Sequence, residues 1–88
     1  MACSVYILQS RKNGSLYVGS SDDPTKRLAH HNAGKSTHTS RNVPYELVFS
    51  QEFENIAKAR TMEMKLKSWK RKDFLERIIK DGSIRYQE

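Results

Sequence analysis

The feature that most constrains this chain is an Asn-Gly pair between two short apolar runs. The first run covers residues 4–8 and the second residues 16–19, and the Val, Ile and Tyr residues in them are typical of strands. Asn13-Gly14 between the runs indicates a turn, because a type I′ turn requires positive φ at both central positions. The chain is therefore expected to begin with an antiparallel β-hairpin.

The hairpin places two tyrosines on one face. Side chains alternate along a strand, so Tyr6 is expected on the same face as Tyr17 and Gly19. A tight two-residue turn leaves the tyrosines offset along the ladder, whereas a looser loop brings them opposite each other. Tyrosines in strands are usually packing residues with a hydrogen-bonded hydroxyl, so this pattern alone leaves their role open.

The rest of the chain predicts one more strand and three helices. Asp23-Pro24 is typical of a helix start, with Asp as N-cap and Pro at the first helical position, and Gly34 is a suitable stop. Later apolar residues recur first at strand and then at helical spacing. The fold class is thus α+β, a three-stranded antiparallel sheet flanked by helices in the order β-β-α-β-α-α. Its strands are expected at 4–8, 16–19 and the first part of 45–53, and its helices at 23–34, 55–68 and 71–80.

Length and charge limit the possible functions. With 88 residues, the chain supports a single domain, 1–88, with its core at about 4–80. Lys and Arg total 16 against 10 acids, a net charge of +6 that favours nucleic acid first and an anionic membrane surface second. The same charge also fits a basic protein that is merely kept soluble by it.

Cysteine usage and hydropathy bear on the compartment. Cys3 is the only cysteine, which excludes an internal disulfide and a thiolate metal site. A reducing, cytoplasmic location is expected from this usage. No apolar run approaches the ~18 residues needed to span a bilayer, so no membrane association is expected.

The first helix carries an arginine and a histidine on one flank. Leu28 is expected to point inward, and Arg27 and His31 fall together beside it on neighbouring turns. Arg offers a fixed fork of donors, and His donates or accepts near neutral pH, so the pair suits a phosphate. A solvated basic flank is the alternative, and the spacing alone favours it.

The second helix places a carboxylate where an apolar residue is expected. Glu63 falls between Ala59 and Ile56 on a helical wheel, inside the arc that faces the sheet. A carboxylate there is costly unless it is paired or bound to a cation. A divalent metal is one explanation, since Mg²⁺ takes oxygen ligands and few of them from protein. The other is an ion pair with Lys67 at i+4, which the sequence alone favours.

As an ordered set, these residues resemble the GIY-YIG nuclease superfamily, and in particular its small stand-alone bacterial single-domain type. The resemblance covers about residues 4–79. Ser4 stands where the signature has its first glycine, and residues 36–43 differ from the loop of small relatives. The matching segments are the two signature halves, the Arg-His helix, the metal-binding glutamate and the segment after it: Ser4-Val5-Tyr6, Tyr17-Val18-Gly19, Arg27 to His31, Glu63 and Lys67-Ser68-Trp69.

The resemblance implies hydrolysis of a phosphodiester with one divalent ion, Mg²⁺ or Mn²⁺. By position, Glu63 holds the metal, and Tyr6 takes a proton from the attacking water, while Tyr17 orients that water or shares the role of Tyr6. Arg27 stabilises the charge that develops on the phosphoryl group, and His31 assists Tyr6 or contacts phosphate. Gly19 leaves room for a phosphate backbone.

A tyrosine serves as a base at neutral pH only if its pKa falls. The ordinary pKa of a tyrosine is near 10, and nearby positive charge lowers it. Arg27, His31 and the metal are expected to supply that charge beside Tyr6.

The implied partner is nucleic acid, and specifically DNA that is structured, damaged or single-stranded. A monomer is expected, with a separate protein partner as a possible source of specificity. The alternatives are a nucleic-acid-binding module without useful turnover and a protein-interaction domain. The basic residues expected to contact nucleic acid, which equally fit solvated helix faces and loops, are Lys35, His38, Arg41, Lys65, Lys67, Lys70 and Arg71.

Overall fold

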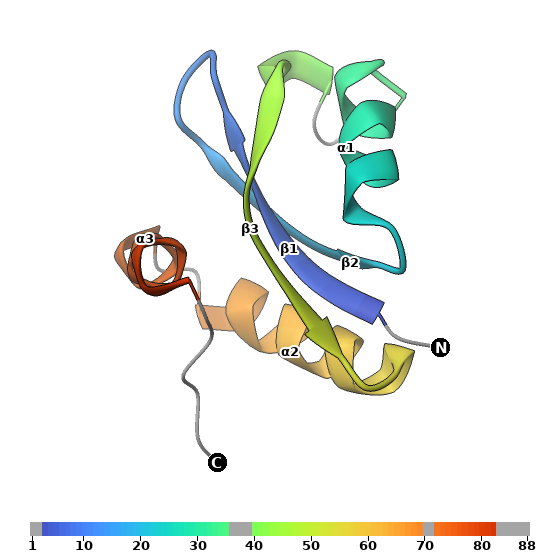
Figure 1. Cartoon of the computed structure of the whole chain (residues 1–88). Helices are drawn as coiled ribbons and strands as arrows, with labels where there is room; N and C mark the ends of the chain where they lie inside the picture. Colours follow the sequence, from blue (N-terminus) through green and yellow to red (C-terminus); the bar gives the residue numbers. More distant parts are fainter. Residues whose placement is uncertain (1–2, 36–39, 70–71, 83–88) are drawn as a thin grey trace.

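The computed structural model describes residues 3–35, 40–69 and 72–82. A three-stranded antiparallel sheet in the order β2-β1-β3 carries helices on both faces, as Figure 1 shows. The predicted order β-β-α-β-α-α is confirmed, and a short 3₁₀ helix, Ser40–Asn42, precedes the third strand. The elements are β1 (Cys3–Ser10), β2 (Leu16–Ser21), α1 (Pro24–Asn32), β3 (Tyr45–Phe53), α2 (Ile56–Trp69) and α3 (Lys72–Asp81).

The hairpin between β1 and β2 is closed by a loop of residues 11–14 rather than by a two-residue turn. Ser10 and Ser15 close it, since the Ser10 amide donates to the Ser15 carbonyl at 2.8 Å. The Ser10 hydroxyl oxygen accepts from the amides of Lys12 and Asn13, which satisfies backbone groups that a tight turn would pair differently. Gly14 supplies the positive φ, 75°, that the loop needs.

This loop sets the register of the tyrosines. Tyr6 pairs with Gly19 and Leu8 with Tyr17. The tyrosines share one face, as predicted, but they lie diagonally, so the looser loop does not bring them opposite each other. The diagonal places the two phenols next to each other along one side of the sheet.

The two faces of the sheet bury separate apolar clusters. β1 is the central strand, and its residues 5–8 are buried on both faces, which explains their continuous apolar run. One face packs on α1, and its cluster contains Tyr6, Leu8, Tyr45, Tyr17 and Leu28. The other packs on α2 and α3, and its cluster contains Cys3, Val5, Ile7, Val18, Phe49, Ala59, Leu66 and Ile78.

One residue of the predicted α2 stripe lies outside the core. Ile56 is 52% exposed, although its spacing predicts burial. It is the first residue of α2, and helical side chains lean toward the N-terminus, so its side chain extends past the packed part of the helix. The Asn55 side chain caps this end, accepting from the Lys58 amide at 2.9 Å.

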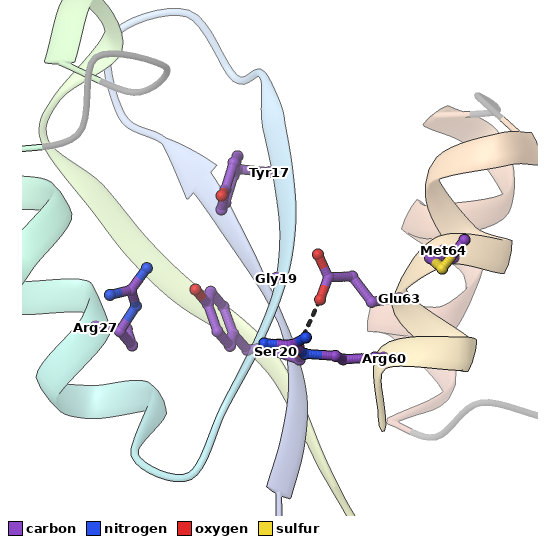
Figure 2. A pocket seen from close by; sticks show the side chains of 8 residues that line it. Tyr17, Gly19, Ser20, Arg27, Arg60, Glu63 and Met64 are labelled. Atoms are coloured by element: carbon purple, nitrogen blue, oxygen red, sulfur yellow. Dashed lines mark hydrogen bonds between the residues drawn. The ribbon is translucent and has the colours of Figure 1, made fainter. Parts of the chain in front are cut away.

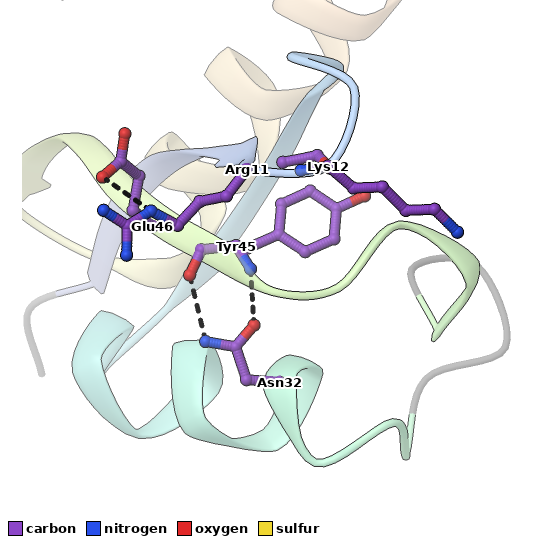
Figure 3. A network of polar contacts seen from close by, with 6 residues as sticks. Arg11, Lys12, Asn32, Tyr45 and Glu46 are labelled. Atoms are coloured by element: carbon purple, nitrogen blue, oxygen red, sulfur yellow. Dashed lines mark hydrogen bonds and ion pairs between the residues drawn. The ribbon is translucent and has the colours of Figure 1, made fainter.

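Both ends of α1 are held in place. At its start, Asp23 Oδ1 accepts from the Lys26 amide at 3.1 Å. At its end, Asn32 Nδ2 donates to the Tyr45 carbonyl at 3.0 Å, and the Tyr45 amide donates to Asn32 Oδ1 at 2.7 Å (Figure 3). These contacts fix the helix that carries Arg27 and His31 against the first residue of β3.

None of the helices that the described residues form is long and apolar enough to cross a membrane.

Candidate active site

Side chains from four elements line an open pocket of about 370 Å³. It lies at the edge strand β2, and Figure 2 shows Arg27 and Glu63 approaching Gly19 and Ser20 from two different helices. Of the five residues predicted as catalytic or metal-binding, the pocket brings four together, all except His31. The lining residues are Tyr6, Tyr17, Gly19, Ser20, Arg27, Arg60, Glu63 and Met64.

Glu63 reaches this pocket from the opposite side of the sheet. α2 packs on the face away from the tyrosines, but the carboxylate reaches the open edge of β2. Ser20, which alternates with Gly19 and faces α2, donates from its hydroxyl to Glu63 Oε1 at 2.5 Å. The side chain of Glu63 remains 19% exposed. The edge position of β2 therefore lets groups from both faces share one pocket.

The ion pair with Lys67 is also present. Lys67 Nζ lies 2.6 Å from Glu63 Oε2, one turn along α2. It also lies 5.6 Å from the centroid of the Tyr17 ring, within range of a cation–π contact. The predicted ion pair between Glu63 and Lys67 is thus confirmed, and the same half-buried carboxylate lines the pocket.

The Tyr6 ring packs closely against Gly19. A β-carbon added at residue 19 would lie 2.5 Å from the Tyr6 hydroxyl oxygen and 2.6 Å from its Cζ. Tyr6 is 1% exposed, so its ring is packed into the sheet face although the residue lines the pocket. The lack of a side chain at Gly19 therefore makes room for the Tyr6 ring, and Gly19 also lines the pocket. Room for a phosphate backbone beside Gly19 stays a prediction.

The electrostatics of Tyr6 differ from the expectation. Burial raises the pKa of the Tyr6 hydroxyl above its ordinary value, and the neighbouring Arg27 guanidinium only partly offsets this. Tyr17 and the Glu63 carboxylate raise the pKa further. Tyr6 is therefore a neutral phenol at pH 7 in the free protein.

His31 lies beneath the pocket rather than in it. Its ring is fully buried and packs edge-on against Tyr17, with ring centroids 4.9 Å apart. Burial lowers the pKa of His31, and the charges of Arg27 and His30 lower it further, so the ring is neutral at pH 7. Burial excludes the predicted phosphate contact, and a neutral ring adds no positive charge beside Tyr6.

The other basic residues are placed as follows. Lys35 and Arg41 are exposed, and Lys65 is half-buried on α2, but none of these three lines the pocket. The predicted contacts His38, Lys70 and Arg71 lie outside the described residues.

Sequence reasoning missed three of the lining residues. Ser20 follows Gly19 on the other face of β2, and it lines the pocket because that strand lies at the edge of the sheet. Arg60 and Met64 flank Glu63 on α2, and Met64 is 70% exposed. The spacing of Arg60, one turn before Glu63, was a usable signal, since residues three apart on a helix are neighbours.

Any metal at this pocket would depend on a single carboxylate. Among the residues that the structure describes, no group of three or more His, Cys, Asp or Glu side chains converges. Glu63 nevertheless suits Mg²⁺, which usually keeps several waters and takes one or two protein carboxylates together with substrate phosphates. The donor set thus fits a metal that arrives with its substrate.

Known proteins resemble this chain over most of its length. It is 38% identical over 68 residues to a UPF0213 protein of Streptococcus pneumoniae, covering 76% of this chain and 68% of that protein. It is 33% identical over 79 residues to one of Staphylococcus saprophyticus, covering 89% and 94%.

A solved structure and a family model agree with these relatives. The solution NMR structure of a UPF0213 protein from Bacillus halodurans matches 93% of this chain and 87% of its own, with a TM-score of 0.58 and 29% identity. The model of the GIY-YIG catalytic domain, a nuclease-type family, matches residues 2–77. The chain therefore belongs to the GIY-YIG family.

Proposed function

We propose that this protein is a metal-dependent endonuclease that hydrolyses phosphodiester bonds in DNA. The observation that carries the proposal is the convergence of Tyr6, Tyr17, Arg27 and Glu63 on one pocket. These residues come from four elements and from both sides of the sheet. Packing alone gives no reason to gather two phenols, a guanidinium and a carboxylate at an open edge.

The two tyrosines position the attacking water. The Tyr6 hydroxyl is a neutral phenol at pH 7 in the free protein, and in this state its oxygen only accepts a hydrogen bond from the attacking water. To act as the base, Tyr6 first releases its own proton to solvent, and the phenolate then takes the proton of the attacking water. Proton transfer requires a lower Tyr6 pKa, and the Arg27 guanidinium is a positive charge of this chain that favours the phenolate. Tyr17 borders the same space and is held by His31 packed against its ring.

The charged residues act on the phosphate. Arg27 is exposed at the pocket and offers a rigid fork of donors to the oxygens on which negative charge develops. Glu63 would hold a Mg²⁺ or Mn²⁺ ion. When bound, that ion supplies Lewis-acid stabilisation of the phosphoryl group and of the leaving oxygen. Arg60 and Lys67 add positive charge at the same edge of β2, where the DNA backbone would lie.

The experiment compares cutting of single-stranded, duplex and branched DNA and of RNA, with Mg²⁺, Mn²⁺ or EDTA. Metal-dependent cutting that is lost in Glu63→Ala and in Arg27→Ala is the expected result. Glu54→Ala is the matched control, because Glu54 makes the same kind of ion pair, 2.6 Å to Lys58, outside the pocket.

A binding module without turnover is the second candidate. Two observations favour it: the raised pKa of the Tyr6 hydroxyl, and the ion pair that the Glu63 carboxylate already makes with Lys67. It predicts salt-dependent DNA binding with no cutting under any metal, and that binding persists in Glu63→Ala. Absence of both cutting and salt-dependent binding would refute both candidates and leave a protein-interaction domain.

A further inference from the structure

Both oxygens of the Glu63 carboxylate are already occupied. Oε1 accepts from the Ser20 hydroxyl at 2.5 Å, and Oε2 lies 2.6 Å from Lys67 Nζ. The side chain is only 19% exposed, so few other directions of approach remain. A cation that binds this carboxylate must therefore replace one of the two partners or share an oxygen with it.

The charges at the pocket disfavour sharing. The described residues bring three positive side chains to this site, Arg27, Arg60 and Lys67, against the single negative charge of Glu63. A divalent cation added beside all three would experience repulsion from each. Moving the Lys67 ammonium out of its 2.6 Å contact with the carboxylate relieves the repulsion that it would exert on a cation bound there.

Lys67 is the partner that is able to leave. Its side chain is 48% exposed, and an ion pair between neighbouring helical turns at such exposure is weak. Ser20, by contrast, is a short side chain on a strand paired with β1. The Lys67 ammonium also has a second position within reach, because it already lies 5.6 Å from the centroid of the Tyr17 ring.

We infer that Lys67 and a divalent cation compete for Glu63 Oε2, so that the metal binds by displacing the ammonium. This inference rests on the proposed function, because it takes Glu63 as the metal ligand. After displacement the ammonium remains near the Tyr17 ring and no longer pairs with Glu63, so it is able to contact a phosphate. Lys67 thereby keeps the metal affinity of the free protein low and becomes a DNA contact once the metal is bound.

The test is a Mn²⁺ titration of the full chain without nucleic acid, with free Mn²⁺ measured by electron paramagnetic resonance. Lys67→Met is expected to lower the Kd for Mn²⁺ by about twofold, the change that an i,i+4 ion pair of this exposure supports. Arg60→Met controls for loss of one positive charge at the pocket, and Lys58→Met for loss of an equivalent ion pair elsewhere. Both controls are expected to shift the Kd less than Lys67→Met does.

A second measurement does not depend on any variant. In the unmodified protein, Mg²⁺ is expected to move the Lys67 side-chain NMR signals toward those of an unpaired lysine, with Lys58 unaffected. An unchanged Kd for Mn²⁺ in Lys67→Met, or an equal shift of the Kd in Arg60→Met, would overturn the proposed competition between Lys67 and the metal. If Glu63→Gln still abolishes Mn²⁺ binding in that case, the metal ligand of the proposed function stands. If no form binds Mn²⁺ at Glu63 and no substrate is cut, both fail.

Discussion

Tyr6 and Gly19 lie directly opposite each other in the β1–β2 ladder, and the phenol ring of Tyr6 fills the space that a β-carbon at residue 19 would need. The pair places a buried tyrosine at the pocket without exposing its ring. The position of the proposed water-activating group therefore depends on a residue that has no side chain.

Gly19→Ala is expected to destabilise the protein and to abolish cutting. The added methyl group would lie 2.5 Å from the Tyr6 hydroxyl oxygen, so the ring must move. Overpacking of this kind costs about 1–3 kcal/mol in the free energy of unfolding, measured by urea denaturation. In a Tyr6→Leu background the same change should cost much less, because the clashing atoms are gone. An equal cost in both backgrounds would show that the strain lies elsewhere.

Tyr6→Phe is expected to retain the fold and lose activity. The ring packing is kept while the hydroxyl that contacts the reacting water is removed, and loss of a general base typically slows a reaction by about 100-fold or more. The rate of cutting with Mg²⁺ is the measurement. Tyr45→Phe is the matched control, since Tyr45 belongs to the same apolar cluster but does not line the pocket. Equal rates for the two variants would contradict a role for the Tyr6 hydroxyl.

Asn32→Ala is expected to loosen α1 from the sheet. It removes both hydrogen bonds to the Tyr45 backbone and leaves those groups without a protein partner, which costs about 1–3 kcal/mol. Amide exchange at Tyr45 should accelerate, because its N–H donates to Asn32 Oδ1. Asn13→Ala, which removes an exposed amide from the hairpin loop, serves for comparison. Unchanged exchange at Tyr45 would argue against this anchor.

His31 is expected to make stability depend on pH. Burial lowers its pKa in the folded state below the ordinary 6.5, so between the two values the unfolded chain binds more protons. The stability due to the neutral ring is complete above about pH 6.5 and is lost as the pH falls toward the lower, folded-state pKa. In His31→Phe, which keeps an aromatic ring against Tyr17, that part of the pH dependence should vanish.

The measurement is the free energy of unfolding between about pH 7 and pH 5, the interval in which histidine normally titrates. His30→Phe is the matched control on the same helix, since His30 is only half-buried. If wild type and His31→Phe lose stability in parallel over this interval, the buried neutral histidine is not the cause.

The sequence predicted the local elements well because each has a local cause. Asp23 and Pro24 start α1, and alternation along the strands fixes Tyr6 and Tyr17 on one face. The hairpin register does not follow from the turn motif, because the Ser10 hydroxyl, which also donates to the Asn42 carbonyl, organises the loop through a contact distant in sequence. A turn motif carries no information about such a contact.

Patterns along the chain thus determined the element order, the shared face of the tyrosines and the presence of a carboxylate on the inner arc of α2. Tertiary structure decided that β2 lies at the sheet edge, which lets Glu63 and Ser20 reach a pocket shared with Tyr6 and Arg27 from the other face. It also decided that His31 is buried and neutral and that Tyr6 is a neutral phenol. The physical reason is that periodicity depends on the spacing of neighbours along one element, whereas edge position and desolvation depend on which other elements pack against it.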